Sequence, residues 1–121
     1  MKKNANKAPG QRQLKVSEAI RSALAKIFLE EDFYGSCLQG ISITISEVRI
    51  GSDLKHAIVF VLPLGGKVPE GFLEALRDLV PQLRHKIGPF LKLRYTPNLS
   101  FRIDDSFEYA NKINTILSKI Q

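Results

Sequence analysis

Residues 41–62 read ISITISEVRIGSDLKHAIVFVL and contain two strand patterns joined by a turn. Apolar and hydroxyl side chains alternate over residues 41–45, and this period of two is typical of a half-buried strand. The next apolar residues fall on even positions, so we expect a bulge near Glu47. Residues 51–53 suit a turn, and residues 57–62 are apolar on both parities, as in a central strand. The stretch therefore predicts a β-hairpin.

Helical periodicity flanks this hairpin on both sides. Ahead of it, apolar residues recur every three or four positions, which predicts a helix that fades through the acidic run 30–32 and stops by Gly35. After the hairpin, Pro69 suits the first turn of a second helix, because its missing N–H costs nothing there. Gly88 and Pro89 are expected to end that second helix.

Pro81 interrupts the second helix. An interior proline removes one hydrogen bond and clashes with the preceding turn, so the helix must kink or split there. Residues 99–103 alternate again and predict a third strand, and Asp105 with Glu108 has the spacing of a capping box that opens a last helix. The expected fold class is α+β, with the order α-β-β-α-(kink)-α-β, a C-terminal helix, and helices packed on a three-stranded sheet.

Length and composition fit one domain, since the chain has 121 residues and is 44% hydrophobic. Residues 1–10 are polar and basic, and we expect a flexible arm there, followed by a single domain over residues 11–121. No run approaches the roughly 20 apolar residues of a membrane span, and no apolar core of a secretory signal follows the first lysines. Cys37 is the one cysteine, which favours a reducing, cytoplasmic setting.

Basic residues exceed acidic ones by 18 to 12, a net charge of +6 at pH 7, and they are segregated along the chain. Residues 1–15 and 79–103 contain no acid. Such segregation is the electrostatic footprint of a polyanion binder, although charge alone fits a merely solvated basic surface equally well. The candidate RNA-binding side chains are Lys2, Lys3, Lys7, Arg12, Lys15, Lys26, Arg84, Lys86, Lys92 and Arg94.

Groups suited to catalysis are sparse. His56 and His85 lie at no metal-ligand spacing from each other or from Cys37, so no metal is predicted. The adjacent acids Asp104 and Asp105 are better explained as caps of the last helix than as an acid–base pair. No phosphate-binding loop, dinucleotide fingerprint or nucleophile elbow occurs. We expect a binding protein with no cofactor, no small-molecule substrate and no enzymatic activity.

The element order resembles the second topological form of the K-homology RNA-binding domain. That domain clamps the nucleotide backbone with a Gly-X-X-Gly loop between two helices. No two glycines here are three residues apart, and Pro81 occupies the place of the loop. A K-homology-like shape without the clamp favours recognition of a structured RNA surface.

Four stretches carry a closer resemblance. They comprise QRQLKVSEAI at 11–20; ITISEVRI at 43–50 with DLKHA at 53–57; LRHKIG at 83–88 with LKLRYTPNL at 91–99; and DDSFEYA at 104–110. In this order and spacing they resemble the ribosome-binding factor A family of bacterial small-subunit maturation factors.

The resemblance implies a K-homology type II fold, an interhelical kink in place of the clamp, and no catalysis. It also implies binding to the free 30S small ribosomal subunit, assistance to late maturation and processing of 16S rRNA, and a part in cold adaptation. The family kink usually carries an Ala-X-Gly pattern, where this chain has Leu79-Val80-Pro81. Nothing in the sequence demands more than a monomer.

Two other classes of function stay open from the residues alone. One is an α+β protein-interaction or ligand-binding domain with incidental basicity, in which neutralising the cations of residues 84–94 leaves partner binding unchanged. The other is a small enzyme that uses His56 with Asp53 or Asp104. In that case His56→Ala is expected to abolish function.

Overall fold

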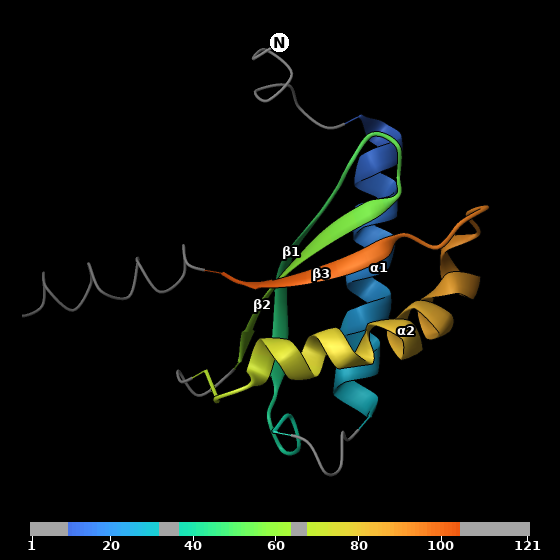
Figure 1. Cartoon of the computed structure of the whole chain (residues 1–121). Helices are drawn as coiled ribbons and strands as arrows, with labels where there is room; N and C mark the ends of the chain where they lie inside the picture. The colour runs from blue at the N-terminus through green and yellow to red at the C-terminus, as the bar shows by residue number, and fades with distance from the viewer. Residues whose placement is uncertain (1–9, 32–36, 64–67, 105–121) are drawn as a thin grey trace, which may run out of the picture.

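The computed structural model describes residues 10–31, 37–63 and 68–104. These residues form two helices and three strands (Figure 1). The elements are α1 (Gln11–Glu30), β1 (Ile43–Ile50), β2 (His56–Pro63), α2 (Phe72–Leu91) and β3 (Asn98–Ile103). The predicted basic arm over 1–10, except for Gly10, and the predicted C-terminal helix lie outside the described residues.

The three strands form one mixed sheet in the order β1-β2-β3. β1 and β2 pair antiparallel as the predicted hairpin, and their register shifts between Ile45 and Glu47, which confirms the expected bulge. β3 pairs parallel to β2, with His56 opposite Asn98. β2 is the middle strand, and its odd-numbered side chains from Ala57 on are buried, whereas the apolar even-numbered ones from Ile58 on are half-buried.

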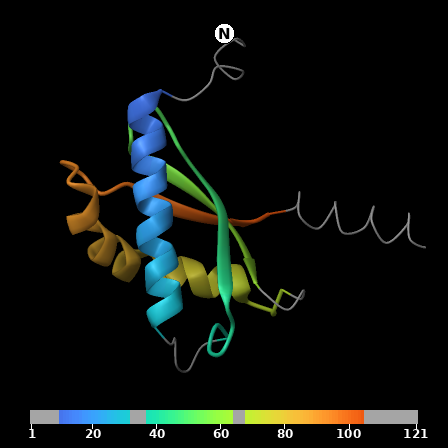
Figure 2. The same ribbon diagram turned by 180° about the vertical axis from the view of Figure 1, so that it is seen from behind.

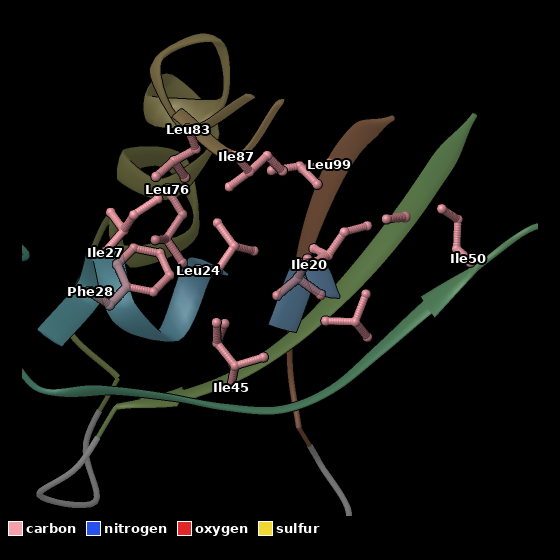
Figure 3. Close-up of a cluster of buried hydrophobic side chains, with 14 of the residues drawn as sticks. Ile20, Leu24, Ile27, Phe28, Ile45, Ile50, Leu76, Leu83, Ile87 and Leu99 are labelled. Atoms are coloured by element: carbon pink, nitrogen blue, oxygen red, sulfur yellow. The ribbon is translucent and has the colours of Figure 1, made fainter. Parts of the chain in front are cut away.

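Both helices pack on one face of the sheet, and the core lies between the helices and the sheet (Figure 3). From behind, α1 stands in the foreground with the sheet beyond it (Figure 2). The predicted apolar stripe of α1 is buried, and the odd-numbered side chains of β2 point into the same cluster. The buried residues include Ile20, Leu24, Ile45, Val48, Ala57, Val59, Val61, Leu76, Leu83, Ile87 and Leu99.

The predicted bounds of the second helix are wrong at both ends. α2 begins at Phe72, because Gly71 has a left-handed backbone and the N–H of Phe72 closes a turn onto the carbonyl of Pro69 at 3.1 Å. The helix also runs through Pro89 to Leu91. A proline disfavours helical backbone in the preceding residue largely by clashing with its Cβ, and Gly88 has none.

The helix neither splits nor ends at Pro81. α2 is continuous across this residue, and its course visibly changes direction (Figure 1). Pro81 has no N–H to donate to the preceding turn, and a bend is the expected response. The first half of α2 thus buries Phe72 and Leu76, and the second half buries Leu83 and Ile87, against the same core.

The two helix-capping glycines allow a matched test of backbone strain. Gly71 has φ of 78°, whereas Gly10 has φ of −68°, which any residue adopts. An added Cβ at Gly71 meets nothing within 4 Å, so its cost is conformational. We expect Gly71→Ala to lower the free energy of unfolding by about 1–2 kcal/mol more than Gly10→Ala does. Urea titration of both variants measures the difference; equal losses would contradict the left-handed assignment.

None of the helices within the described part of the chain is both long enough and apolar enough to span a membrane.

Candidate RNA-binding surface

The start of α1 is fastened to the hairpin by Gln13. Its side-chain Nε2 donates to the carbonyl of Ile50 at 3.0 Å, where β1 ends. Its Oε1 accepts the N–H of Gly10 at 3.0 Å and so caps the helix. One glutamine therefore sets the position of the first turn, which carries Arg12, relative to the turn between β1 and β2.

The connection from α2 to β3 is fastened by Arg84. Its guanidinium donates from Nη2 to the carbonyl of Thr96 at 2.7 Å and from Nε to that of Pro97 at 3.1 Å. Gly88 lets the connection pass close to the helix, since an added Cβ there would lie 3.1 Å from the hydroxyl of Thr96. Pro97 is fully buried. Thr96 and Pro97 are thus held against α2.

Arg84→Lys tests whether Arg84 positions the connection through its two hydrogen bonds. Lysine keeps the charge but lacks the planar fork that donates to two carbonyls at once. We expect a loss of about 1–2 kcal/mol in the free energy of unfolding, because a part-buried carbonyl loses its donor. Guanidinium denaturation measures it, with Lys92→Arg as a charge-preserving control at an exposed site. Unchanged stability in Arg84→Lys would show that the two bonds contribute nothing.

Three elements meet at a small hollow that we call the cationic hollow. Its basic lining residues are Arg12 from α1, Lys55 from the hairpin turn and Arg94 from the connection to β3, and its volume is about 170 Å³. The N–H of Asn98 donates to the carbonyl of Lys55 at 2.8 Å, which ties the hairpin turn to the start of β3. The Asp53 carboxylate accepts the N–H of Lys55 at 3.1 Å and so shapes the turn.

Tyr95 adds an aromatic ring to this hollow. It lines the hollow beside Leu93, and it is 66% exposed although its neighbour Pro97 is buried. The guanidinium carbon of Arg94 lies 5.6 Å from the centre of the Tyr95 ring, within the range of a cation–π contact. The hollow therefore combines positive charge with an accessible aromatic surface.

A larger groove of about 600 Å³ lies between α1 and the end of α2. Small side chains of α1, Ala19 and Ala23 among them, line one wall, and Phe90 lines the other. Lys26 and Lys86 also line it, together with Glu30. Lys86 forms an ion pair with Glu31, so its charge is already matched within the chain. Each of the two depressions has one acid in its lining, Glu30 in this groove and Asp53 in the cationic hollow, but the hollow has three basic residues against its one acid.

A third depression of about 530 Å³ lies beside Pro81, between the first half of α2 and β3. It is lined by Arg77 and Leu73 of the helix and by residues 98–101 of the strand. In the K-homology domain the Gly-X-X-Gly clamp sits between the two helices. Pro81 lines this depression from within the continuous helix α2 and offers no N–H to a phosphate.

Several other cations are matched by neighbouring acids. The Arg21 side chain hydrogen-bonds Glu18 and holds the pKa of that carboxyl below its ordinary value. Arg49 donates to Glu47 at 2.7 Å, a hydrogen bond that raises the pKa of Arg49, and lies over the Phe60 ring at 5.2 Å. Within the described ranges, no ion pair forms at the exposed residues Arg12, Lys15, Lys26, Lys55, Lys92 and Arg94.

The structure thus divides the basic residues predicted from the sequence. Arg12, Lys15 and Lys26 share one exposed flank of α1, at the 100° per residue of a helix, and Lys92 and Arg94 follow the end of α2. Arg84 and Lys86 are instead engaged within the chain. Lys2, Lys3 and Lys7 lie outside the described residues.

Sequence reasoning missed Gln13, Lys55 and Tyr95. All three stand inside stretches already singled out by their family resemblance, yet none belongs to a recognised binding pattern. Lys55 lies in a turn that also contains Asp53, so it is not part of an acid-free stretch like those that pointed to the other cations. The hydrogen bond between Lys55 and Asn98, together with the register of β2 and β3, shows that this turn lies beside the connection that carries Arg94.

The catalytic pairing of His56 with Asp104 is wrong. The parallel register sets His56 opposite Asn98 and Val61 opposite Ile103, so Asp104 lies at the far end of the two strands. The Asp53 carboxylate is engaged by the N–H of Lys55. Among the residues that the structure describes, no three His, Cys, Asp or Glu side chains gather as a metal site would require.

Comparison with known proteins finds relatives that all carry one description. The family model described as ribosome-binding factor A matches residues 12–117. The ribosome-binding factor A of Phenylobacterium zucineum is 44% identical over 105 residues, which cover 87% of this chain and 72% of that protein. That of Rhodospirillum rubrum is 39% identical over 119 residues, which cover 98% of this chain and 73% of that protein.

Two solved structures are similar in fold. The crystal structure of ribosome-binding factor A from Thermus thermophilus has a TM-score of 0.62 at 22% identity, covering 75% of this chain and 93% of that one. A homology model of the Thermus thermophilus protein, fitted into a cryo-EM map of its complex with the 30S subunit, has a TM-score of 0.58 at 22% identity. It covers 71% of this chain and 88% of that one. The described elements therefore have the K-homology-like arrangement predicted from their order.

Proposed function

This chain belongs to the ribosome-binding factor A family, and we propose that it binds the free 30S small ribosomal subunit in the cytoplasm. We propose further that it assists late maturation and processing of 16S rRNA, with a part in growth at low temperature. It does this by binding, without catalysis and as a monomer. Its relatives carry the name of binding factors, and one is fitted into a map of a 30S complex.

The observation that carries the proposal is the convergence of Arg12, Lys55 and Arg94 on one hollow. Cations that neutralise phosphates release bound counterions, which supplies affinity for RNA without reading its sequence. The RNA-docking surface comprises Arg12, Lys15, Lys26, Lys55, Lys92 and Arg94. Lys2, Lys3 and Lys7 belong to the proposal as further phosphate contacts, because they precede Arg12 closely in the chain.

The docking surface recognises shape and charge together. Its cations come from α1, the hairpin turn and the end of α2, and two hydrogen bonds, Gln13 to Ile50 and Asn98 to Lys55, fix these three elements to each other. A fixed spacing of cations matches only an RNA surface whose phosphates have the same spacing. Specificity then comes from the folded ribosomal RNA, since phosphate contacts position a protein but carry no base information.

Sedimentation of purified chain with small subunits tests the proposal. At low salt the chain is expected to move with the 30S particle, and raising the salt should release it steeply. Soluble chain that stays at the top of the gradient at low salt, when small subunits are in excess, would overturn it. Unprocessed 16S rRNA should accumulate in cells that lack the chain, and normal processing would remove that part of the proposal.

A further inference from the structure

We propose that Tyr95 and the cationic hollow form a subsite for one unpaired nucleotide of RNA, whose base stacks on Tyr95 while Arg12 and Lys55 hold its phosphate. This rests on the proposed function and specifies the RNA element that meets the docking surface. That element is a bulged or loop nucleotide next to a helix. A continuous duplex offers no such element.

The exposure of Tyr95 is the first support. Tyrosine is enriched at contact surfaces, because it combines an apolar ring with a polar hydroxyl. Tyr95 is 66% exposed, and Arg94 lies over its ring at 5.6 Å. The Arg94 guanidinium thus lies over the ring, and the exposed remainder of Tyr95 is accessible to a flat partner.

The rigidity of the connection is the second support. Arg84 holds the carbonyls of Thr96 and Pro97, and Pro97 is buried, so the residues after Tyr95 are fixed to α2. Lys55 is fixed from the other side through its carbonyl and the N–H of Asn98. A stacking ring and a phosphate ligand on fixed supports lose little freedom on binding, which raises affinity.

The chemistry of the hollow favours an unpaired nucleotide over duplex RNA and over a protein. Bases of an A-form helix are stacked inside it, where Tyr95 has no access to their faces, whereas unpaired bases in loops and bulges stack on aromatic side chains. An acidic peptide would satisfy Arg12 and Lys55, but it has no flat ring to cover Tyr95. The joint presence of cations and an exposed ring is what single-stranded nucleic acid requires.

The test uses the full chain and two RNA hairpins that differ in one nucleotide. One hairpin carries a single bulged fluorescent adenine analogue, and the other is fully paired. The wild-type chain should bind the bulged hairpin more tightly and quench its fluorescence. Tyr95→Ser should lose about tenfold in affinity for the bulged hairpin and leave that for the paired one unchanged. Tyr95→Phe should restore both the affinity and the quenching, because the ring is kept.

Phe90→Ser is the matched control, since Phe90 is 63% exposed and lies in the α1–α2 groove. It should keep the preference for the bulge. Equal affinity of the wild-type chain for the two hairpins, or an unchanged preference in Tyr95→Ser, would overturn the subsite. The subsite would also be overturned if Tyr95→Ser weakened binding of a poly-glutamate peptide as much as it weakened binding of the bulged RNA. Sedimentation with small subunits separates the two proposals, because wild-type chain that binds the particle but shows no bulge preference contradicts only the subsite.

Discussion

Replacing Arg12, Lys55 and Arg94 with Gln is expected to weaken binding to the small subunit about 100-fold at moderate salt. Each side chain is exposed, no described acid pairs with it, and all three line one hollow. A net contribution of about 1 kcal/mol for each charged contact adds to about 3 kcal/mol, and about 1.4 kcal/mol corresponds to a factor of ten. The logarithmic slope of affinity against salt should also fall, by about 2 to 3.

The matched control removes the same total charge elsewhere. Arg21→Gln, Arg49→Gln and Arg102→Gln together also lower the net charge by three, but Arg21 and Arg49 are paired with Glu18 and Glu47. Sedimentation at several salt concentrations compares the two triple variants. Equal weakening in both would show that only net charge matters and would remove the docking surface. Full binding by both would favour the protein-interaction domain with incidental basicity.

Leu24→Ala is expected to lower the free energy of unfolding by about 3 kcal/mol. The Leu24 side chain is 0% exposed and lies in the core with Ile20 and Ile45 (Figure 3). Removing its branched end costs the transfer free energy of the lost carbons and leaves a cavity, because packed neighbours relax only in part. Small domains are stable by only about 5–15 kcal/mol, so this one change removes a large share.

The matched control lies on the same helix, close to its end. Leu29 is 86% exposed, and Leu29→Ala makes the same chemical change without opening a cavity. Its effect should stay within about 0.5 kcal/mol. Urea unfolding followed by circular dichroism measures both variants. A similar loss at the two positions would mean that the apolar stripe of α1 is not the face that packs on the sheet.

The strands were the most predictable part of the fold because their side-chain period reports burial directly. The parity change after Ile45 in the sequence became the register shift between Ile45 and Glu47 in the sheet. The double-sided apolar run of β2 became the middle strand. The bulge and the central strand could both be predicted because successive side chains of a strand point to opposite faces of the sheet. The stripe of α1 was equally plain, since helical spacing defines one buried face.

The ends of α2 were predicted wrongly because they depend on conformations that residue type alone does not fix. Gly71 took a left-handed backbone and delayed the start of the helix to Phe72. Gly88 gave no clash with the ring of Pro89, so the helix continued. Glycine can adopt backbone conformations that other residues disfavour, and residue type alone does not show which of them it takes.

The site was predictable as a basic region but not residue by residue. Charge segregation pointed to Arg12 and Arg94, and the fold places both at one hollow. The sequence could not show that Arg84 faces two carbonyls or that Lys86 meets Glu31, because each partner comes from a distant part of the chain. Long-range contacts of this kind decide which cations remain available to a partner.

The parallel pairing of β3 with β2 has a consequence for how the cationic hollow is assembled. Parallel neighbours need a long crossover, here through α2, so their pairing requires the closure of a large loop. The cationic hollow holds residues from both sides of that closure, Arg12 and Lys55 before it and Arg94 after it. A nascent chain, or one cut within α2, contains the hairpin without the hollow. We therefore expect the hollow, and the RNA binding proposed for it, only after β3 has been made and has paired with β2.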